Sequence, residues 1–448
     1  GGHGRRLENR KSISTPRSTR PSRRVRCYSS ASTKDVVVVG GGWAGFGAAK
    51  HLAEQGYAVT LLDASRNVGG LSSGWRDASS NRPMEAGMKG FWYQYHNIFK
   101  LVSDLAITPN PFTDWTESSF YGPDGKLITT GPVFQRQPKL PTMLGQAVYT
   151  FPRFDAEMFS PADLASILAM FPSMMDFNSS EEAYEAYDQM TAKELFRSSG
   201  VTSRMYEKFL KPLLLVGLFA PAEELSAASV LETLYFYAAG HQNDFDVCWC
   251  RGPVSERIFE PLVSHIESKG GVIKGGQAVV DVQVDSGRVT GVLAKDLDTK
   301  EDHTYKADAV VMAVGINGMQ AILRSSDTLA GLDEFRRIMN LRCIDCVATR
   351  LWFDKRVDVS TPSNVFAGFE ENIGGTFFHL NDLHDEYAAE GKPSVITADF
   401  YHANEFIPMS DEDIIDRVKM HLGTCIPGFQ QAKVNEYNVV KFPKAVTH

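Results

Sequence analysis

The stretch "DVVVVGGGWAGFGAAKHLAEQGYAVTLLDASRNVGG", from Asp35 to Gly70, decides how this chain folds. Its run of four valines predicts a buried parallel strand over 35–40, since both faces of such a strand are covered. Small residues and a closing Gly56 predict a helix over 44–56, and "YAVTLLDA" predicts a second strand. Strand, glycine-rich turn, helix and strand together form a βαβ unit.

Three glycines at the strand-to-helix turn, Gly40, Gly42 and Gly45, form the pattern G-x-G-x-x-G. The first allows a tight turn, the second lets backbone approach a pyrophosphate, and the third lets helix and strand pack closely. The helix N-terminus then offers free N–H groups to the phosphates. Asp63 ends the next strand, where a carboxylate accepts hydrogen bonds from ribose hydroxyls. The pattern therefore predicts a dinucleotide site, the alternative being a glycine turn without a ligand.

A second glycine turn favours FAD over a nicotinamide dinucleotide. Gly69 and Gly70, followed by Leu71, come just after Asp63 and would close over the same pyrophosphate. This doublet is typical of flavoproteins with two dinucleotide-binding domains and unusual in plain nicotinamide dehydrogenases. We therefore expect an α/β fold with a Rossmann-like FAD-binding domain of that type, joined to a mixed, helix-rich substrate domain.

Two stretches resemble a known superfamily. "GGGWAGFGAAKHLAEQGYAVTLLDASRNVGG" resembles the FAD fingerprint of the flavin amine oxidase and phytoene desaturase superfamily, and "MEAGMKGFWYQYHNIFKLVSDLAI" resembles more specifically the carotenoid desaturases. The resemblance implies that a segment near the isoalloxazine contains Glu85, Gly87 and Met88. It also implies that later strands of the FAD domain, where backbone meets adenine, contain Val280, Ala313 and Gly315. For Glu85, a buried and paired structural carboxylate is an equal alternative.

The chain also departs from the desaturase pattern. Lys89 and His96 stand where that family carries His and Pro, so the activity of this chain need not be phytoene desaturation itself. Each of the two residues is expected to position the flavin or to lie on the surface, and we nominate no catalytic acid or base. The final stretch "KFPKAVTH" lacks the Gly-Asp segment that contacts the ribityl chain in the family, so we expect the C-terminal FAD segment to be missing.

The changing pattern along the chain predicts a discontinuous organisation. We assign 35–100 and 250–330 to the FAD-binding domain, and 101–249 with 331–448 to the substrate domain. Residues 1–34 form a separate basic leader. They hold eight Arg, two Lys and one Glu, a net charge of +9, which leaves −17 for the rest of a chain whose total is −8.

That leader is rich in Arg, Ser and Thr, which is the composition of an organelle transit peptide. The resemblance to carotenoid desaturases favours a chloroplast, with a mitochondrion or a basic disordered tail as alternatives. The acidic body carries no footprint of a nucleic-acid-binding protein. A single CxxC, Cys343 and Cys346, does not predict a zinc site, and we interpret the two as buried thiols or as a redox pair.

Two apolar helical segments, 162–177 and 204–220, could pack in the core or line a lipid-facing entrance. The second possibility makes peripheral membrane contact an expectation. A helical domain rich in apolar side chains also suits an apolar small-molecule substrate.

Three functions remain open from the sequence. The first, implied by the resemblance, is an FAD-dependent desaturase or isomerase of a carotenoid or other isoprenoid. It would transfer a hydride from a substrate carbon to flavin N5, with a quinone or oxygen as the final electron acceptor. The second is a flavin-dependent amine oxidase. The third is a non-catalytic FAD-binding protein, because binding the cofactor and turning it over are separable.

Overall fold

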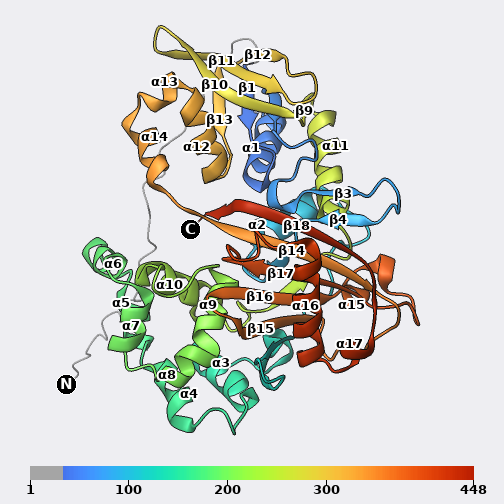
Figure 1. Cartoon of the computed structure of the whole chain (residues 1–448). Coiled ribbons are helices and arrows are strands. Elements are labelled where there is room, and N and C mark those ends of the chain that lie inside the picture. Colours follow the sequence, from blue (N-terminus) through green and yellow to red (C-terminus); the bar gives the residue numbers. More distant parts are fainter. Residues whose placement is uncertain (1–33, 448) are drawn as a thin grey trace, which may run out of the picture.

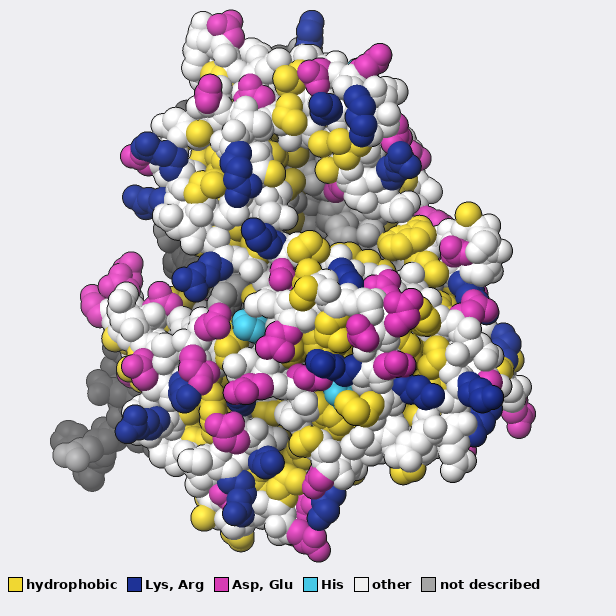
Figure 2. All heavy atoms as spheres, viewed as in Figure 1, with side chains coloured by type: hydrophobic (Ala, Val, Ile, Leu, Met, Phe, Trp, Pro, Cys, Tyr) yellow, Lys and Arg dark blue, Asp and Glu magenta, His cyan; other side chains and the backbone are white. Residues whose placement is uncertain are grey.

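The structure is a computed structural model that describes residues 34–447, so the predicted leader lies almost wholly outside the described residues. Figure 1 shows a lobe built on the N-terminal strands, and below it a larger body built on a second sheet and a group of helices. Figure 2 shows the surface hollowed between this lobe and the body.

A parallel four-stranded sheet forms the centre of the lobe. Its order is β13-β1-β2-β9, and each neighbouring pair is parallel. The predicted strand, turn, helix and strand are present, with ends that differ from the expected ones by at most two residues, so the α/β, Rossmann-like prediction is confirmed. The bounds are β1 Asp35–Val39, α1 Trp43–Glu54, β2 Ala58–Leu62, β9 Val272–Lys274 and β13 Ala309–Met312.

Both faces of β1 are buried, as the valine run predicts. Val38 packs in a core with Phe46 of α1 and with α11, whereas Val37 and Val39 pack in a separate core with α12 and a hairpin sheet on the other face. Ser286 and Gly287, both at positive φ, form the hairpin turn between β10 and β11 of that sheet. The covering elements are β10 Gln277–Asp285, β11 Arg288–Asp296, β12 Asp302–Lys306, α11 Glu260–Ser268, α12 Ile316–Ser325, α13 Asp327–Ala330 and α14 Asp333–Arg337.

The body contains a seven-stranded sheet of order β18-β14-β17-β16-β15-β6-β7. Along β17, Ile396, Ala398 and Phe400 pack against α16, so the period of two turns Asp399 and Tyr401 toward the opposite face. Its elements are β6 Ser118–Tyr121, β7 Leu127–Gly131, β14 Cys343–Phe353, β15 Ser363–Glu370, β16 Ile373–His379, β17 Val395–Tyr401, β18 Val434–Thr447, with α15 Leu380–Leu383, α16 Asp411–Cys425 and α17 Gly428–Gln431 beside them.

In the helical part of the body, the apolar segments contain both buried and exposed side chains. Met170 and Met174 are buried in its core, whereas Leu168, Phe171 and Met175 are 46%, 40% and 58% exposed. One segment therefore contributes side chains both to the core and to the surface, and a lipid-facing entrance stays a prediction. Within 34–447, no helix is long and apolar enough to cross a membrane. The helices are α3 Thr142–Thr150, α4 Pro161–Leu168, α5 Phe171–Asp176, α6 Glu181–Asp188, α7 Ala192–Ser198, α8 Ser203–Met205, α9 Lys211–Gly217 and α10 Ala227–Leu234, with π-helical turns η4 Tyr206–Leu210 and η5 Tyr235–Ala239.

Short elements connect the lobe to the body. They are two small antiparallel sheets, β3 with β4 and β5 with β8, and the helix α2. Their bounds are β3 Gly74–Arg76, β4 Pro83–Glu85, β5 Gly90–Trp92, α2 His96–Asp104 and β8 Val247–Trp249, and a third π-helical turn, η6 Ser255–Phe259, precedes α11.

The packing of α1 against the turn that precedes it can be tested with two glycines of the same helix. A Cβ added at Gly45 would lie 1.8 Å from the carbonyl oxygen of Gly40, whereas one at Gly47 meets nothing within 4 Å. We expect Gly45→Ala to lower the free energy of unfolding by about 1–3 kcal/mol, because the helix must move away from the sheet. Gly47→Ala should instead raise it by up to about 1 kcal/mol. Denaturant unfolding of both variants checks this, and equal effects would contradict the close packing.

Candidate functional site

The turn between β1 and α1 is built so that backbone fills the space where side chains would lie. Gly40 has φ +104°, and a Cβ there would lie 2.5 Å from the carbonyl oxygen of Ala313. Gly42 precedes the first residue of α1, and no side chain caps that helix. The N–H groups of the first turn are therefore left for another acceptor.

The second glycine turn lies against the first. A Cβ on Gly70 would stand 3.1 Å from the Cα of Gly42, so the two turns approach as closely as backbone allows. Gly69 and Gly70 both have positive φ. Asp63 lies beside them, where its Oδ2 accepts from the Gly41 N–H at 2.5 Å. Burial raises the pKa of this carboxyl, with the N–H donors acting in the opposite direction.

Two of the three predicted residues of the later strands, Ala313 and Gly315, reach the same end of the parallel sheet. Ala313 follows β13, where its N–H donates to Val39, and Gly315 is the N-cap of α12. Val280 lies at a register shift of β10, and its carbonyl accepts from Ser325 Oγ at 2.6 Å. The start of β10 is tied to this end of the sheet, since the Gln277 N–H donates to the carbonyl of Asp63. Parallel strands place ligands at their carboxyl ends, and Ala313, Gly315 and the start of β10 meet there. Val280 lies farther along β10, against the last residue of α12.

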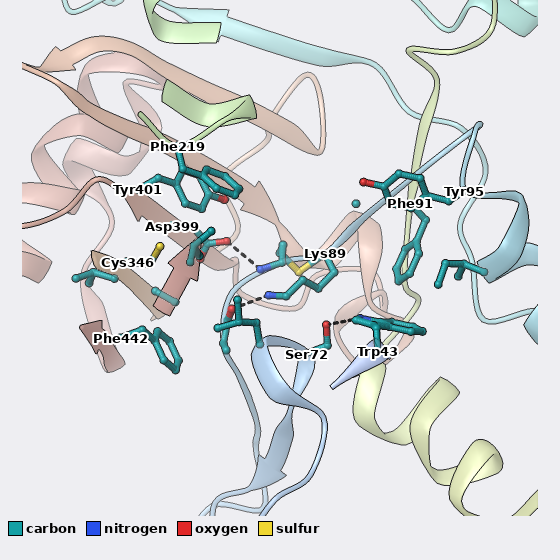
Figure 3. A pocket seen from close by; sticks show the side chains of 18 residues that line it. Trp43, Ser72, Lys89, Phe91, Tyr95, Phe219, Cys346, Asp399, Tyr401 and Phe442 are labelled. Atoms are coloured by element: carbon teal, nitrogen blue, oxygen red, sulfur yellow. Dashed lines mark hydrogen bonds between the residues drawn. The ribbon is translucent and has the colours of Figure 1, made fainter. Parts of the chain in front are cut away.

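A cavity of about 420 Å³ lies between the glycine turns and the seven-stranded sheet. Of the predicted residues, Leu71 and Met88 line it. Figure 3 shows Trp43 and Ser72 on one side, joined by a hydrogen bond of 2.9 Å, with Tyr401 and Phe219 on another. The lining consists of Trp43, Leu71, Ser72, Ala86, Met88, Lys89, Gly90, Phe91, Tyr95, Ile98, Phe219, Cys346, Val347, Ala348, Asp399, Tyr401, Phe442 and Val446.

Two charged side chains belong to this lining, Lys89 and Asp399. Lys89 Nζ donates to the carbonyls of Ala86 and Gly87 at 2.6 and 3.1 Å. Asp399 Oδ2 accepts from the Met88 N–H at 2.9 Å, and its Oδ1 has no hydrogen-bond partner among the described residues. Burial raises the pKa of Asp399 to about 6, although the charge of Lys89 opposes this. Burial also lowers the pKa of Lys89, against the charges of Asp399 and Glu85.

Glu85 does not line the cavity. Its Oε2 lies 3.2 Å from the Arg350 guanidinium, both side chains are almost fully buried, and its Oε1 accepts from the Val254 N–H. Burial acts to raise the pKa of Glu85, but the charges of Arg350 and His384 outweigh it and the pKa is lowered. The structure therefore shows the second of the two alternatives for Glu85, the buried and paired carboxylate.

The two residues that depart from the desaturase pattern lie in different surroundings. Lys89 lines the cavity, whereas His96 is exposed and its Nε2 lies 2.8 Å from Gln94 Oε1. Of the four aromatic residues in the desaturase-like stretch, Phe91, Trp92, Tyr93 and Tyr95, Phe91 and Tyr95 line the cavity.

Several cavity residues were missed by sequence reasoning. Phe219, Tyr401 and Phe442 come from regions without a motif. Asp399 had a signal, because it is the one acidic residue in the otherwise uncharged strand "VITADFY".

The CxxC does not form a disulfide. Cys343 and Cys346 are free and half-buried on β14, which is less burial than expected. Burial raises the pKa of Cys346 to about 12, which disfavours a reactive thiolate. Among the described residues no group of three or more His, Cys, Asp or Glu could hold a metal ion.

A comparison with protein families bears on this geometry. The model of the flavin containing amine oxidoreductases matches residues 43–447. The chain belongs to this family. It is therefore an oxidoreductase whose cofactor is FAD, and the predictions of family, enzyme class and cofactor are confirmed. The site fits the cofactor, since the facing glycine turns and the uncapped helix leave room and N–H donors for a pyrophosphate.

Individual members of the family are similar over most of the chain. The 15-cis-phytoene desaturase of Solanum lycopersicum is 25% identical over 92% of this chain and 69% of its own length. A probable zeta-carotene desaturase of Synechococcus elongatus is 23% identical over 92% of this chain and 88% of its own. The solved cyclohexylamine oxidase of Brevibacterium oxydans has a TM-score of 0.64 at 14% identity, covering 92% of this chain and 85% of that one, and shares the fold.

The buried carboxyl of Asp399 should give this flavoprotein a characteristic pH dependence. With a pKa near 6 when folded and an ordinary pKa of 3.8, Asp399 contributes stability that is present below pH 3.8 and is lost as the pH rises through 6. The unfolding free energy of wild type minus that of Asp399→Asn should therefore fall between these pH values, by on the order of 3 kcal/mol. A flat profile for Asp399→Asn would contradict the burial of its charge.

Proposed function

We propose that this protein is an FAD-dependent desaturase or isomerase acting on an elongated apolar molecule, a carotenoid or another isoprenoid. The observation that carries the proposal is the lining of the 420 Å³ cavity, which is aromatic and aliphatic apart from a few polar side chains, and which adjoins the glycine turns. The similarity to phytoene and zeta-carotene desaturases over 92% of the chain supports the same substrate class.

The residues that would hold the cofactor are those of the turns. The N–H groups at the start of α1 would bind the pyrophosphate, with Gly42 and Gly70 permitting its close approach. Asp63 would accept from a ribose hydroxyl, and the segment around Val280 would meet the adenine. Leu71 and Met88 would border the isoalloxazine, because they line the cavity beside the turns. The chemistry that bound FAD would supply is that of a hydride acceptor for a substrate carbon.

The chain's own contribution is to align the substrate, exclude water and take a proton. The apolar wall orients a hydrocarbon and keeps water away from the reacting carbons. Asp399 is the side chain we assign to the proton that leaves the neighbouring carbon, since its Oδ1 is without a partner among the described residues. Lys89 would hold the Ala86–Gly87 backbone in place through its two hydrogen bonds. A quinone or oxygen would be the final acceptor of the electrons removed from the substrate.

One pair of aromatic side chains in the cavity, Phe219 and Tyr401, does not form the cage that would favour amine oxidation. A cage for an amine needs two rings with space for the substrate between them. Phe219 and Tyr401 contact each other directly instead, with ring centroids 4.3 Å apart.

The proposal is tested by the visible spectrum of the purified protein. We expect flavin absorption bands that bleach under anaerobic conditions on addition of a carotenoid precursor, because the substrate would reduce the flavin. Bands that bleach only with amines would support an amine oxidase instead. Bands that bleach with neither would support a non-catalytic FAD-binding protein.

A matched pair of variants links that spectrum to the predicted site. Asp63→Ala removes the carboxylate beside the glycine turns and should lower the flavin content. Asp298→Ala removes an exposed carboxylate that pairs with Arg66 in the same lobe, and should leave the flavin content unchanged.

The surface of the helical part supports peripheral membrane contact. Exposed apolar side chains gather on neighbouring elements, Leu144 and Val148 on α3, Leu168 at the end of α4, and Phe171 on α5. An apolar substrate dissolved in a lipid bilayer could enter from such a surface. A chloroplast location agrees with the chloroplastic relatives, and import of a fusion of the leader to a reporter would test it.

Membrane contact predicts the outcome of flotation with anionic liposomes. The wild-type protein should float, and Phe171→Glu with Leu168→Glu should shift most of it to the soluble fraction, because two charges would have to enter the interface. Met420, 61% exposed on α16, provides the control Met420→Glu, which should float like the wild type. Wild-type protein that stays wholly in the soluble fraction would contradict membrane contact.

A further inference from the structure

A second cavity lies among the helices of the body. Its volume is about 190 Å³, below the roughly 300–1,000 Å³ typical of a site that holds a whole small ligand. Its lining is almost entirely apolar, with Thr129, Gln146 and Thr150 as the polar exceptions. Such a space suits one end of a longer apolar molecule. Besides these three residues, the walls include Phe120 of β6, Phe171 and Met174 of α5, Phe209 of η4 and Tyr237 of η5, together with Phe154 and Met170.

Two tyrosines stand between this cavity and the first one. Tyr95 lines the first cavity and Tyr237 lines the second, and their hydroxyl oxygens are 3.2 Å apart. Figure 3 shows Tyr95 beside Phe91, on the side of the first cavity away from Asp399 and Tyr401. The ring of Trp92 packs against Tyr237 and against Phe245, which also lines the second cavity. The hydrogen bond and these ring contacts therefore lie between the two spaces.

Hydrogen bonds join the backbone segments on either side of the two tyrosines. Gln94, next to Tyr95, donates to the buried Asp244 and lies 3.0 Å from His241 Nδ1. The segment of Tyr95 is thus fixed to the segment that follows Tyr237. Tyr237 itself lies in the π-helical turn η5, a local departure from α-helix that is often found at functional sites. Rotation of a side chain can open the passage without moving these segments.

We propose that Tyr95 and Tyr237 form a gate that opens when an elongated hydrocarbon chain extends from the second cavity into the first. The closed state is the hydrogen-bonded pair seen in this structure. The open state replaces that bond with apolar contacts along the chain. The gate rests on the proposed function, since it takes the ligand to be a long apolar molecule.

The gate can be tested by following an apolar probe into the complete, FAD-loaded protein. The probe is 1,6-diphenylhexatriene, whose fluorescence rises when it enters an apolar space. A change in the flavin absorption bands reports its arrival beside the cofactor. Rapid mixing then gives one rate for entry and a second for passage. We expect Tyr237→Phe, which removes the hydrogen bond and keeps the ring, to raise the passage rate about fivefold and to leave the entry rate unchanged.

The shared hydrogen bond also predicts how the single and double variants should compare. Tyr95→Phe should act like Tyr237→Phe, and the double variant should act like either single one, because all three lose the same bond. Tyr305→Phe is the matched control. Its hydroxyl donates to Gln277 in the lobe, far from both cavities in the fold, and its loss should change neither rate.

The possible outcomes separate the gate from the function. If the probe enters but the variants pass at the wild-type rate, the gate is wrong and the substrate class stands. If the two single effects add in the double variant, the tyrosines act through packing and the gate is wrong. If the probe enters neither the wild type nor any variant, the proposed substrate class fails and the gate fails with it.

Discussion

The carbonyl oxygen of Gly40 meets helix α1 at Gly45, where a single methyl group would come within 1.8 Å of it. This contact brings the N-terminus of α1 to the carboxyl end of β1. Since β1, β2 and β13 are parallel, Asp63 and Ala313 arrive at the same edge. Gly70 then closes against Gly42. The arrangement uses backbone where most proteins use side chains, so its surface is made of N–H groups that can approach a phosphate closely.

The cavity beside these turns combines apolar walls with buried charge, which is costly unless each charge finds partners. Outside the cavity lining, Glu85 and Arg350 meet this cost by pairing with each other. Lys89 is held by two carbonyls, whereas Asp399 has a partner for only one oxygen within the described chain. An incompletely satisfied carboxyl in an apolar wall is expensive for folding. Such groups are typical of sites that have to take up a proton.

The lobe was predictable from the sequence because its determinants are local. Valines, glycines and Asp63 lie within one stretch, and the turn at Ser286 and Gly287 needs only its own residues. The cavity was not predictable in the same way. Asp399 and Phe219 reach it only through the seven-stranded sheet and the helices, whose pairing no short pattern encodes. Glu85 stayed ambiguous for the same reason, because its partner Arg350 lies 265 residues away.

The helical segments show a different limit of prediction from the sequence. Periodicity assigns one face of a helix to the core. Met170 and Phe171 are neighbours in the sequence, yet Met170 is buried and Phe171 is 40% exposed. Which apolar face stays uncovered depends on how the short helices α4 and α5 bend around Met170, and tertiary packing decides that.

The strand order of the lobe also has a consequence for the synthesis of the protein. The ribosome releases β1 and β2 early, but their outer neighbours, β13 and β9, come from residues 309–312 and 272–274. Until those strands emerge, β1 and β2 present two bare edges of Val- and Leu-rich backbone, which other chains can pair with. At about 5–20 residues per second, the wait between β2 and β13 lasts roughly 12–50 s. Throughout that time the nascent chain depends on the cell, for instance on a chaperone, to keep those edges apart from others.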